Sequence, residues 1–267
     1  YKDQSVLPDF DTREFTPSYD LLFRDTRFVG GDRISDDQRL TLGITTKLID
    51  PNSGQEKFRA SIAQSVYYAD RKIMLSTIPT AEELAGMGRD RSAIALEVAA
   101  RITNNWRFTS DLVYDDLDNH LEKTGFSARY NDRKKRIFNF TYRYTRRTAR
   151  AYDGQLIDQN IKQTNISGLV PLTANLNLVG RWNHDFTNNR ELEVFAGFEY
   201  HNCCWRTSLF AYRSLRRDDE LLFPEEELKA RNGFAFKIEF KGLGGSGNRV
   251  DKMLNNGIYG YEHDETF

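Results

Sequence analysis

The most regular feature of this chain is an alternation of apolar and polar residues with a period of two. In the segment 234–240, every second residue is phenylalanine or isoleucine, and two of the three residues between them are charged. Successive side chains of a β-strand point to opposite faces of its sheet, so this pattern predicts a strand with one apolar and one wet face. The apolar face is suited either to lipid or to a protein core.

The same period recovers ten earlier segments with apolar residues on one face. Each has roughly the 9 to 11 residues that a tilted strand needs to cross a bilayer. The tenth segment is the least regular, because Phe210 and Tyr212 place aromatic rings on its other face. The ten segments are 40–48, 58–68, 94–102, 106–114, 126–130, 138–144, 166–172, 176–182, 192–200 and 205–211.

The connections between these segments differ according to which end of the strands they join. Outer-membrane barrels have short periplasmic turns and longer external loops. By this rule the turn 201–203 is predicted to be periplasmic, although the connections near Asp116 and Asn188 are short exceptions at the other end. The short turns are 50–54, 103–105, 131–133, 171–175 and 201–203, and the longer segments are 70–90, 146–161 and 216–231.

A soluble β-barrel or sandwich would also contain alternating strands. Two features favour a membrane barrel: aromatic residues gather near segment ends, as in interfacial girdles, and the face opposite the apolar one is strongly polar, as in a wide watery lumen. The aromatic residues are Tyr67, Tyr68, Trp106, Tyr114, Tyr142, Tyr144, Trp182, Tyr200 and Trp205. The polar face carries Arg101, Asp111, Asp115, Arg129, Arg181, Glu193, Glu199, Lys237 and Glu239.

Eleven strands do not close a single-chain bacterial barrel, which has an even number of strands. We therefore predict an all-β fold, an antiparallel transmembrane β-barrel of which this chain holds about eleven C-terminal strands. The predicted organisation is an external loop over 1–36, barrel strands over 37–243 and a C-terminal tail over 244–267. The sequence after Tyr1 contains no secretory signal, as expected of a cytosolic protein or of a chain whose natural start lies upstream.

Composition excludes some other classes of protein. Of the 267 residues, 39% are hydrophobic and 29% are charged, and no run of about 18 apolar residues predicts a transmembrane helix. A net charge of -1 argues against a nucleic-acid partner, which would require a basic face. The glycine-rich stretch 242–247 follows a strand but is predicted to open no helix, so it is not a phosphate-binding loop.

Cys203 and Cys204 are the only cysteines, and they are adjacent. A bond between neighbouring cysteines is strained, and a zinc site would need two more ligands, of which only His201 is near. Buried free thiols are one alternative. In an oxidising periplasm, the two cysteines are instead expected to bond partners upstream of Tyr1 or in another protein.

Catalysis is not predicted. The four histidines, His120, His184, His201 and His263, fall in expected turns, loops or the tail. His184 and Asp185 are the best pair, but neighbours on a strand point to opposite faces and no nucleophile converges with them. We predict no enzyme, no metal site and no cofactor.

Motifs along the whole chain resemble the LPS-assembly protein LptD family of Gram-negative outer membranes. The final segment is followed by Lys241-Gly242-Leu243, as in that family, whereas the tail after Leu243 departs from the family ending. The motifs are Asp3 to Pro8 with Phe10-Asp11, Leu22 to Asp25, Asp32-Arg33-Ile34, Cys203-Cys204 and Gly233 to Phe240.

The resemblance implies a 26-stranded barrel, preceded by a periplasmic jelly-roll domain and integral to the cell outer membrane. The implied function is a translocon component that inserts lipopolysaccharide into the outer leaflet; the alternative is a passive porin-like channel. Implied partners are the lipoprotein LptE inside the lumen, the periplasmic bridge protein LptA reached through the N-terminal domain, lipopolysaccharide itself, and the barrel assembly machinery during folding.

The resemblance also implies roles for individual residues. Cys203 and Cys204 would each bond a cysteine of the N-terminal region. The last strand would form one lip of a lateral gate, with Gly233, Phe234, Phe236, Ile238 and Phe240 as its residues. Independently, the last strand fits a barrel-assembly signal, a polar residue, then glycine, then apolar residues two apart, at Arg231, Gly233, Phe236 and Ile238.

Overall fold

The computed structural model describes residues 3–4, 7–8, 10–15, 17–75, 81–132, 135–146, 148–150, 156–158, 160–216, 229–240, 244–246 and 248–261. The chain divides into two compact units. Unit 1 comprises Tyr1–Ala100 and Thr109–Thr124, and unit 2 comprises Arg101–Phe108 and Gly125–Phe267.

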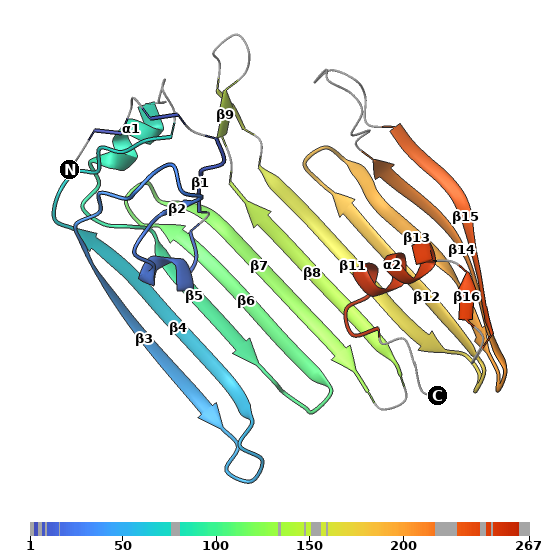
Figure 1. Cartoon of the computed structure of the whole chain (residues 1–267). Coiled ribbons are helices and arrows are strands. Elements are labelled where there is room, and N and C mark those ends of the chain that lie inside the picture. The colour runs from blue at the N-terminus through green and yellow to red at the C-terminus, as the bar shows by residue number, and fades with distance from the viewer. Residues whose placement is uncertain are drawn as a thin grey trace. The chain divides into compact units, whose positions relative to one another are not determined.

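The fold is all-β, as predicted, and each of the eleven predicted segments coincides with a strand (Figure 1). Hydrogen-bonded neighbours follow the order β16-β15-β14-β13-β12-β11-β8-β7-β6-β5-β4-β3. The strands are β3 (Arg39–Ile49), β4 (Glu56–Tyr67), β5 (Ile94–Ala100), β6 (Trp106–Asp115), β7 (His120–Asn131), β8 (Ile137–Thr145), β11 (Ile161–Pro171), β12 (Leu176–Asp185), β13 (Arg190–His201), β14 (Trp205–Arg216), β15 (Lys229–Phe240) and β16 (Gly244–Ser246).

The alternation predicted from the sequence is present, with the apolar face turned outward. On β3, Ile44 is 74% exposed, and on β15 Phe234 is 81% exposed. Residues on the opposite face are buried although polar, including Ser65 and Ser208. A soluble protein buries large apolar side chains and exposes polar ones, so this distribution fits strands whose outer face meets lipid. Among the described residues, no helix is both long and apolar enough to cross a membrane.

The two short connections at the loop end share one geometry. Asp115 closes β6 and its Oδ1 accepts a hydrogen bond from the Leu117 N–H at 2.9 Å, while Asp185 closes β12 and accepts from the Thr187 N–H at 3.0 Å. Each turn then contains an asparagine with positive φ, which asparagine tolerates better than most residues. An aspartate at the strand end and an asparagine four residues later thus make a tight turn possible.

Four of the predicted short turns at the other end, 50–54, 103–105, 171–175 and 201–203, are confirmed as connections between consecutive strands, whereas residue 133 of the turn 131–133 lies outside the described residues. In two of these turns a threonine, Thr103 or Thr173, takes the role that aspartate has at the loop end. Its hydroxyl oxygen accepts hydrogen bonds from the backbone N–H groups two and three residues later. The longer predicted segments contain α1 (Ala81–Met87) and a hairpin of β9 (Thr148–Arg150) and β10 (Leu156–Asp158). Of the three longer predicted segments, residues 76–80, 147, 151–155, 159 and 217–228 lie outside the described residues.

In unit 1, part of the segment before β3 packs against the strands. It contains β1 (Arg13–Glu14), the 3-10 helix η1 (Asp20–Phe23) and β2 (Phe28–Val29). Leu22 of η1 is buried in a cluster with Ala63, Ala95 and Val113, whose small side chains leave room for it. Whether 1–36 lies on the external side stays a prediction.

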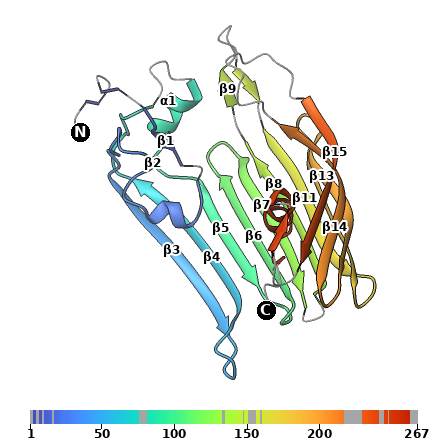
Figure 2. The same ribbon diagram turned by 45° about the vertical axis from the view of Figure 1, so that its right-hand side comes forward.

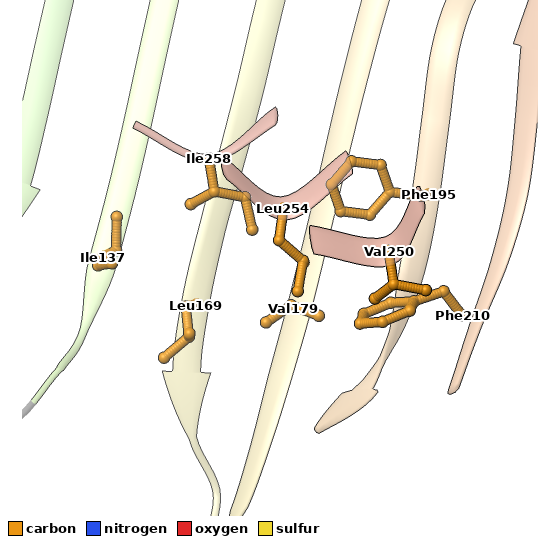
Figure 3. Close-up of a cluster of buried hydrophobic side chains, with 8 residues drawn as sticks. All are labelled: Ile137, Leu169, Val179, Phe195, Phe210, Val250, Leu254 and Ile258. Carbon is orange, nitrogen blue, oxygen red and sulfur yellow. The ribbon is translucent and has the colours of Figure 1, made fainter. Parts of the chain in front are cut away.

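In unit 2, the tail forms a helix, α2 (Asn248–Gly257), over one face of β11 to β14 (Figures 1 and 2). The expectation that no helix follows the stretch 242–247 is therefore wrong. Val250 and Leu254 lie on one side of the helix, and Ile258, the residue after the helix, follows at the same spacing of four. All three meet a patch of apolar side chains on the strands (Figure 3). The strand residues of this patch are Ile137, Leu169, Val179, Phe195 and Phe210.

The patch explains the irregular alternation of the segment 205–211. Phe210 points away from the exposed face and is 1% exposed, with its ring 6.3 Å from that of Phe195. Gly197, its register partner, leaves space for it, because a Cβ there would lie 2.5 Å from Phe210 Cδ1. The second aromatic face of β14 is thus the floor beneath α2.

Candidate functional site

The candidate site is β15, the strand predicted to form the gate. β15 pairs antiparallel with β14 over its whole length, from Lys229 opposite Arg216 to Phe240 opposite Trp205. Phe234, Phe236 and Phe240 are exposed on the outer face. Ile238 shares that face and is partly buried.

The four residues of the predicted assembly signal occupy both faces of β15. Arg231 and Gly233 fall on one face and Phe236 and Ile238 on the other, since their numbers differ in parity. Arg231 is exposed and pairs in register with Ser214. The structure therefore supports a strand with the expected sequence pattern, while recognition by the assembly machinery stays a prediction.

Gly233 lies beneath the ring of Tyr212, its register partner on β14. A Cβ at Gly233 would lie 2.8 Å from the Tyr212 hydroxyl oxygen and 2.9 Å from Cζ, closer than real Cβ atoms approach. An aromatic ring that covers a glycine on a neighbouring strand compensates for the missing side chain and fixes register. A side chain at position 233 would therefore force the Tyr212 ring to move.

The inner face of β15 carries charges that the sequence analysis noted only as lumen residues. Lys237 Nζ donates to Asp251 Oδ1 of α2 at 2.5 Å and also lies 3.0 Å from Glu239. Arg206 of β14 lies 4.0 Å from the Glu239 carboxylate. A buried charge requires a partner, and here Asp251, in the tail, supplies one. The pairing was missed because the tail was expected to hold no helix.

The residues after α2 also attach to the strands. The Tyr261 hydroxyl donates to Glu199 Oε2 at 2.6 Å, and the Asn139 side chain donates to the Tyr259 carbonyl at 3.0 Å. Burial raises the pKa of the Tyr261 hydroxyl, and the Glu199 carboxylate raises it further, so the phenol keeps its proton. The guanidinium of Arg129 lies 4.0 Å from the centre of the Tyr259 ring.

Cys203 and Cys204 lie in the turn between β13 and β14, and both are exposed. Their Sγ atoms are 2.8 Å apart, longer than the ~2.05 Å of a disulfide. Asn202 shapes the turn, because its Oδ1 accepts the N–H groups of Cys204 and Trp205, each at 2.9 Å. Both thiols are therefore accessible to a partner, and the expected bonds to an N-terminal region stay a prediction.

The loop motif of unit 1 that contains Asp32 and Arg33 forms hydrogen bonds within the loop. Asp32 Oδ2 accepts the N–H groups of Phe10 and Asp11, and these two bonds, the Phe10 bond first, hold the pKa of the Asp32 carboxyl below its usual value. The Arg33 guanidinium donates to the Leu7 and Pro8 carbonyls. The motif residues that carried the family resemblance thus fold the loop on itself.

Unit 1 also contains a cavity of about 260 Å³ lined partly by arginines. Four of these arginines pair with carboxylates: Arg27 with Asp36 and Asp37, Arg39 with Asp37, Arg89 with Asp115, and Arg91 with Asp116. Arg71 instead donates to the Gly86 carbonyl and lies over the Tyr67 ring.

One group of side chains in unit 1 has the spacing of metal ligands. The ligand atoms of Asp115, Asp118 and His120 lie within 4.8 Å of one another. However, Arg89 donates to both carboxylates, and His120 Nε2 is 2.7 Å from Glu122. The Arg89 guanidinium already supplies the positive charge that a metal ion would bring to these carboxylates. We therefore do not propose a metal site here.

The histidines do not assemble a catalytic site among the described residues. His120 begins β7, His184 lies in β12 and His201 ends β13, so their expected placement in turns is corrected to strand ends, while His263 lies outside the described residues. The Asp185 carboxylate accepts from the Asn188 amide at 2.7 Å and shapes its turn. The His184 ring instead stacks on Trp182, with centroids 5.3 Å apart.

Comparison with known proteins agrees with the resemblance. The family model LptD, LPS transport system D, matches residues 1–176. The LPS-assembly protein LptD of a Pseudomonas putida strain is 38% identical over 290 residues, which cover 99% of this chain and 30% of the relative. The proteins of the same name from Pseudomonas aeruginosa and Hahella chejuensis are 36% and 31% identical, over 99% and 100% of this chain and 30% and 31% of theirs.

Among solved structures, a NanC porin covers 77% of this chain and 94% of its own, with a TM-score of 0.32 at 10% identity. A TM-score this low adds nothing about the fold. The chain spans about 30% of the length of the curated relatives that it matches. Because the family model covers most of the chain and the relatives align along nearly all of it, this chain belongs to the LptD family, LPS transport system D.

Proposed function

We propose that this chain is the C-terminal part of an outer-membrane translocon that inserts lipopolysaccharide into the outer leaflet, with β15 as one lip of a lateral exit. The proposal concerns the whole protein, of which this chain is a portion. It rests on family membership, on the outward apolar faces of the strands and above all on the two-sided character of β15.

The observation that carries the proposal is the contrast between the two faces of β15. Phe234 and Phe236 are 81% and 60% exposed on the outer face, whereas Lys237 and Glu239 form part of an ion-pair network on the inner face. Lipopolysaccharide has an acidic, sugar-bearing head and several acyl chains. A strand that is apolar outside and charged inside can border a wet route for the head and a lipid route for the chains.

The edges of β15 also differ. One edge pairs with β14 along all twelve residues, whereas the other pairs with β16 only at 238–240. In a closed barrel the remaining edge would meet another strand of the full protein. Opening that seam breaks backbone hydrogen bonds that lipid cannot replace, so a short seam costs less to open than a long one.

Several partners follow from the same proposal. Cys203 and Cys204, exposed in one turn, would bond cysteines of the N-terminal region, and LptA would deliver lipid to that region. LptE would occupy the lumen, and the barrel assembly machinery would recognise β15 during folding. Movement would come from lipid pushed from below, with no reaction catalysed by this chain.

Photocrosslinking in the full-length protein tests the exit. A photoreactive amino acid at Phe236 is compared with one at Phe198 on β13. The two positions lie at the same level of the sheet, because Phe198 pairs with Leu209 and Leu209 with Phe236. Both side chains are exposed on the outer face. We expect lipopolysaccharide to be captured at least several-fold more strongly at position 236.

Equal capture at the two positions would count against a lateral exit at β15. Capture at neither position, together with normal ion conductance of the purified protein, would favour the porin-like channel instead. The comparison therefore separates the two functions that the lumen charges and outer apolar faces allow.

A further inference from the structure

The tail returns to β15 and pairs with its second edge through β16. β16 lies antiparallel to β15, with Phe240 opposite Gly244, Glu239 opposite Gly245 and Ile238 opposite Ser246. This pairing is on the edge that β14 does not use, since the strand order is β16-β15-β14. The covered residues lie at the end of β15 where Phe240 faces Trp205, next to the Cys203–Cys204 turn.

The pairing removes part of β15 from any seam with another strand. Backbone groups of 238–240 that bond β16 are satisfied by the chain itself, whether or not another strand is present. At about 3.4 Å of rise per residue, the covered part is roughly 10 Å of a strand roughly 40 Å long. What is left for a neighbour is the segment 229–237.

Helix α2 holds β16 in this position. It begins two residues after β16 ends, and its Val250 and Leu254 are each 2% exposed against the apolar patch on the strands (Figure 3). The ion pair between Asp251 and Lys237 joins the helix to β15 itself, only one residue before the segment that β16 covers. The tail thus has one contact on the edge of β15 and another on its inner face.

We propose that the tail is a latch: β16 closes the end of the free edge of β15 at residues 238–240, α2 fastens it, and strand separation is confined to 229–237. The position of the latch stands on the geometry of the tail. Its consequence for the seam rests on the function proposed above.

Paired cysteines in the full-length protein test the position. In the variant Glu239→Cys/Gly245→Cys, the new cysteines face each other in register. The matched control, Ala235→Cys/Gly245→Cys, places a cysteine on the same face about 13 Å further along β15. Mass spectrometry of cross-linked peptides distinguishes the new bond from bonds to Cys203 or Cys204. We expect at least tenfold more of the 239–245 bond than of the 235–245 bond.

The neighbouring pair Ile238→Cys/Ser246→Cys tests the same strand pairing with cysteines on the other face of the strands. It replaces the first variant if that variant folds poorly. Yields no higher than those of the control in both register-matched pairs would overturn the latch.

Surface lipopolysaccharide then tests the consequence. The double variant Glu239→Cys/Gly245→Cys, with its bond formed, should export lipopolysaccharide at the same rate as its Glu239→Cys parent, which lacks the same charge. A tenfold fall would mean that β16 must leave the edge during transport, and the latch would be refuted. If position 236 captures no lipopolysaccharide, the lateral exit fails, while the cysteine pairs still decide whether β16 lies on β15.

Discussion

Lys237 of the last strand and Asp251 of the C-terminal helix form an ion pair at 2.5 Å, in which only 6% of the lysine side chain is exposed. The pair joins β15 to α2, two elements that are separated along the chain by β16. Because the ammonium is buried, it depends on its acidic neighbours, Asp251 and Glu239.

Replacing Asp251 by alanine should destabilise the full-length protein. The ammonium of Lys237 would lose its closest partner while remaining buried, although Glu239 at 3.0 Å would still face it. Removing one member of a buried pair costs about 3–5 kcal/mol when nothing replaces it, so with Glu239 present we expect a smaller loss, about 1–3 kcal/mol. The melting temperature of the purified protein in detergent measures the loss.

The double substitution Lys237→Met/Asp251→Leu is the informative companion. Replacing both charges by apolar groups leaves no unpaired ammonium in the site, and Glu239 keeps Arg206 at 4.0 Å as a cationic neighbour, so the double substitution should cost less than Asp251→Ala alone. A double variant that is less stable than the single one would show that the pair contributes net stability in this site.

Leu254→Ala tests the contact of α2 with the strands. Leu254 is 2% exposed within the apolar patch, and truncating a buried leucine leaves a cavity that costs about 2–5 kcal/mol. We expect the tail to become sensitive to added protease. The control Asn255→Ala alters an exposed neighbour on the same helix and should leave cleavage unchanged. Equal cleavage of the two variants would mean that the patch does not retain the helix.

The strands and their faces were predictable because each depends on residues two apart in one short segment. An exposed Phe234 and a buried Ser208 follow from the same rule on different strands. The aspartate and asparagine of the turn after Asp185 are likewise local signals, although the sequence analysis noted this connection only as a short exception.

The cover on the inner face was not predictable from such local patterns. Phe210 was only an irregularity of one segment, and Val250 and Leu254 lay in a tail for which no structure was predicted. Only the fold brings them together, across sequence separations of tens of residues. The buried Lys237 was likewise identified as a lumen residue, but its partner Asp251 lies on a helix that the sequence analysis did not predict.

Gly233→Ala should impair the last strand by crowding Tyr212. The added Cβ would lie 2.8 Å from the tyrosine oxygen, and overpacking of this kind costs typically about 1–3 kcal/mol. Gly180→Ala is a matched control, because its Cβ would lie no closer than 3.4 Å to any neighbour outside its own chain segment. The fraction of folded protein, read from the heat-dependent shift in gel mobility, should fall only for the first variant.

Removing the ring should relieve that crowding. In a background with Tyr212→Ala, the additional cost of Gly233→Ala should shrink to a fraction of its value in the wild type. If the cost of Gly233→Ala stays the same without the Tyr212 ring, glycine is required at position 233 for another reason, for example recognition during assembly.

Cys203 and Cys204 should each support one long-range disulfide in the full-length protein. Both thiols are exposed in one turn, so neither blocks the approach of a partner to the other. Non-reducing electrophoresis of the wild type should show a mobility shift relative to the reduced protein. The double variant Cys203→Ser/Cys204→Ser should show no shift, and each single variant should show a smaller one. A full-length protein with no shift would refute the disulfides and weaken the translocon proposal.

The loop of unit 1 should loosen in acid through Asp32. The N–H groups of Phe10 and then Asp11 lower the pKa of the Asp32 carboxyl in the folded protein. The carboxylate therefore stabilises the folded loop fully at pH values above the pKa of about 3.9 that the unfolded chain would have. This stabilisation is lost as the pH falls through the lower pKa of the folded state. Hydrogen exchange of peptides covering 10–15, corrected for intrinsic rates, should therefore show protection at pH 5 that declines by pH 2.5.

Asp32→Asn should reduce that protection already at pH 5, whereas Asp25→Asn, at an exposed position of the same loop, should behave like the wild type. Equal protection in all three proteins at pH 5 would mean that other contacts, such as those of Arg33, hold the loop without the charge of Asp32.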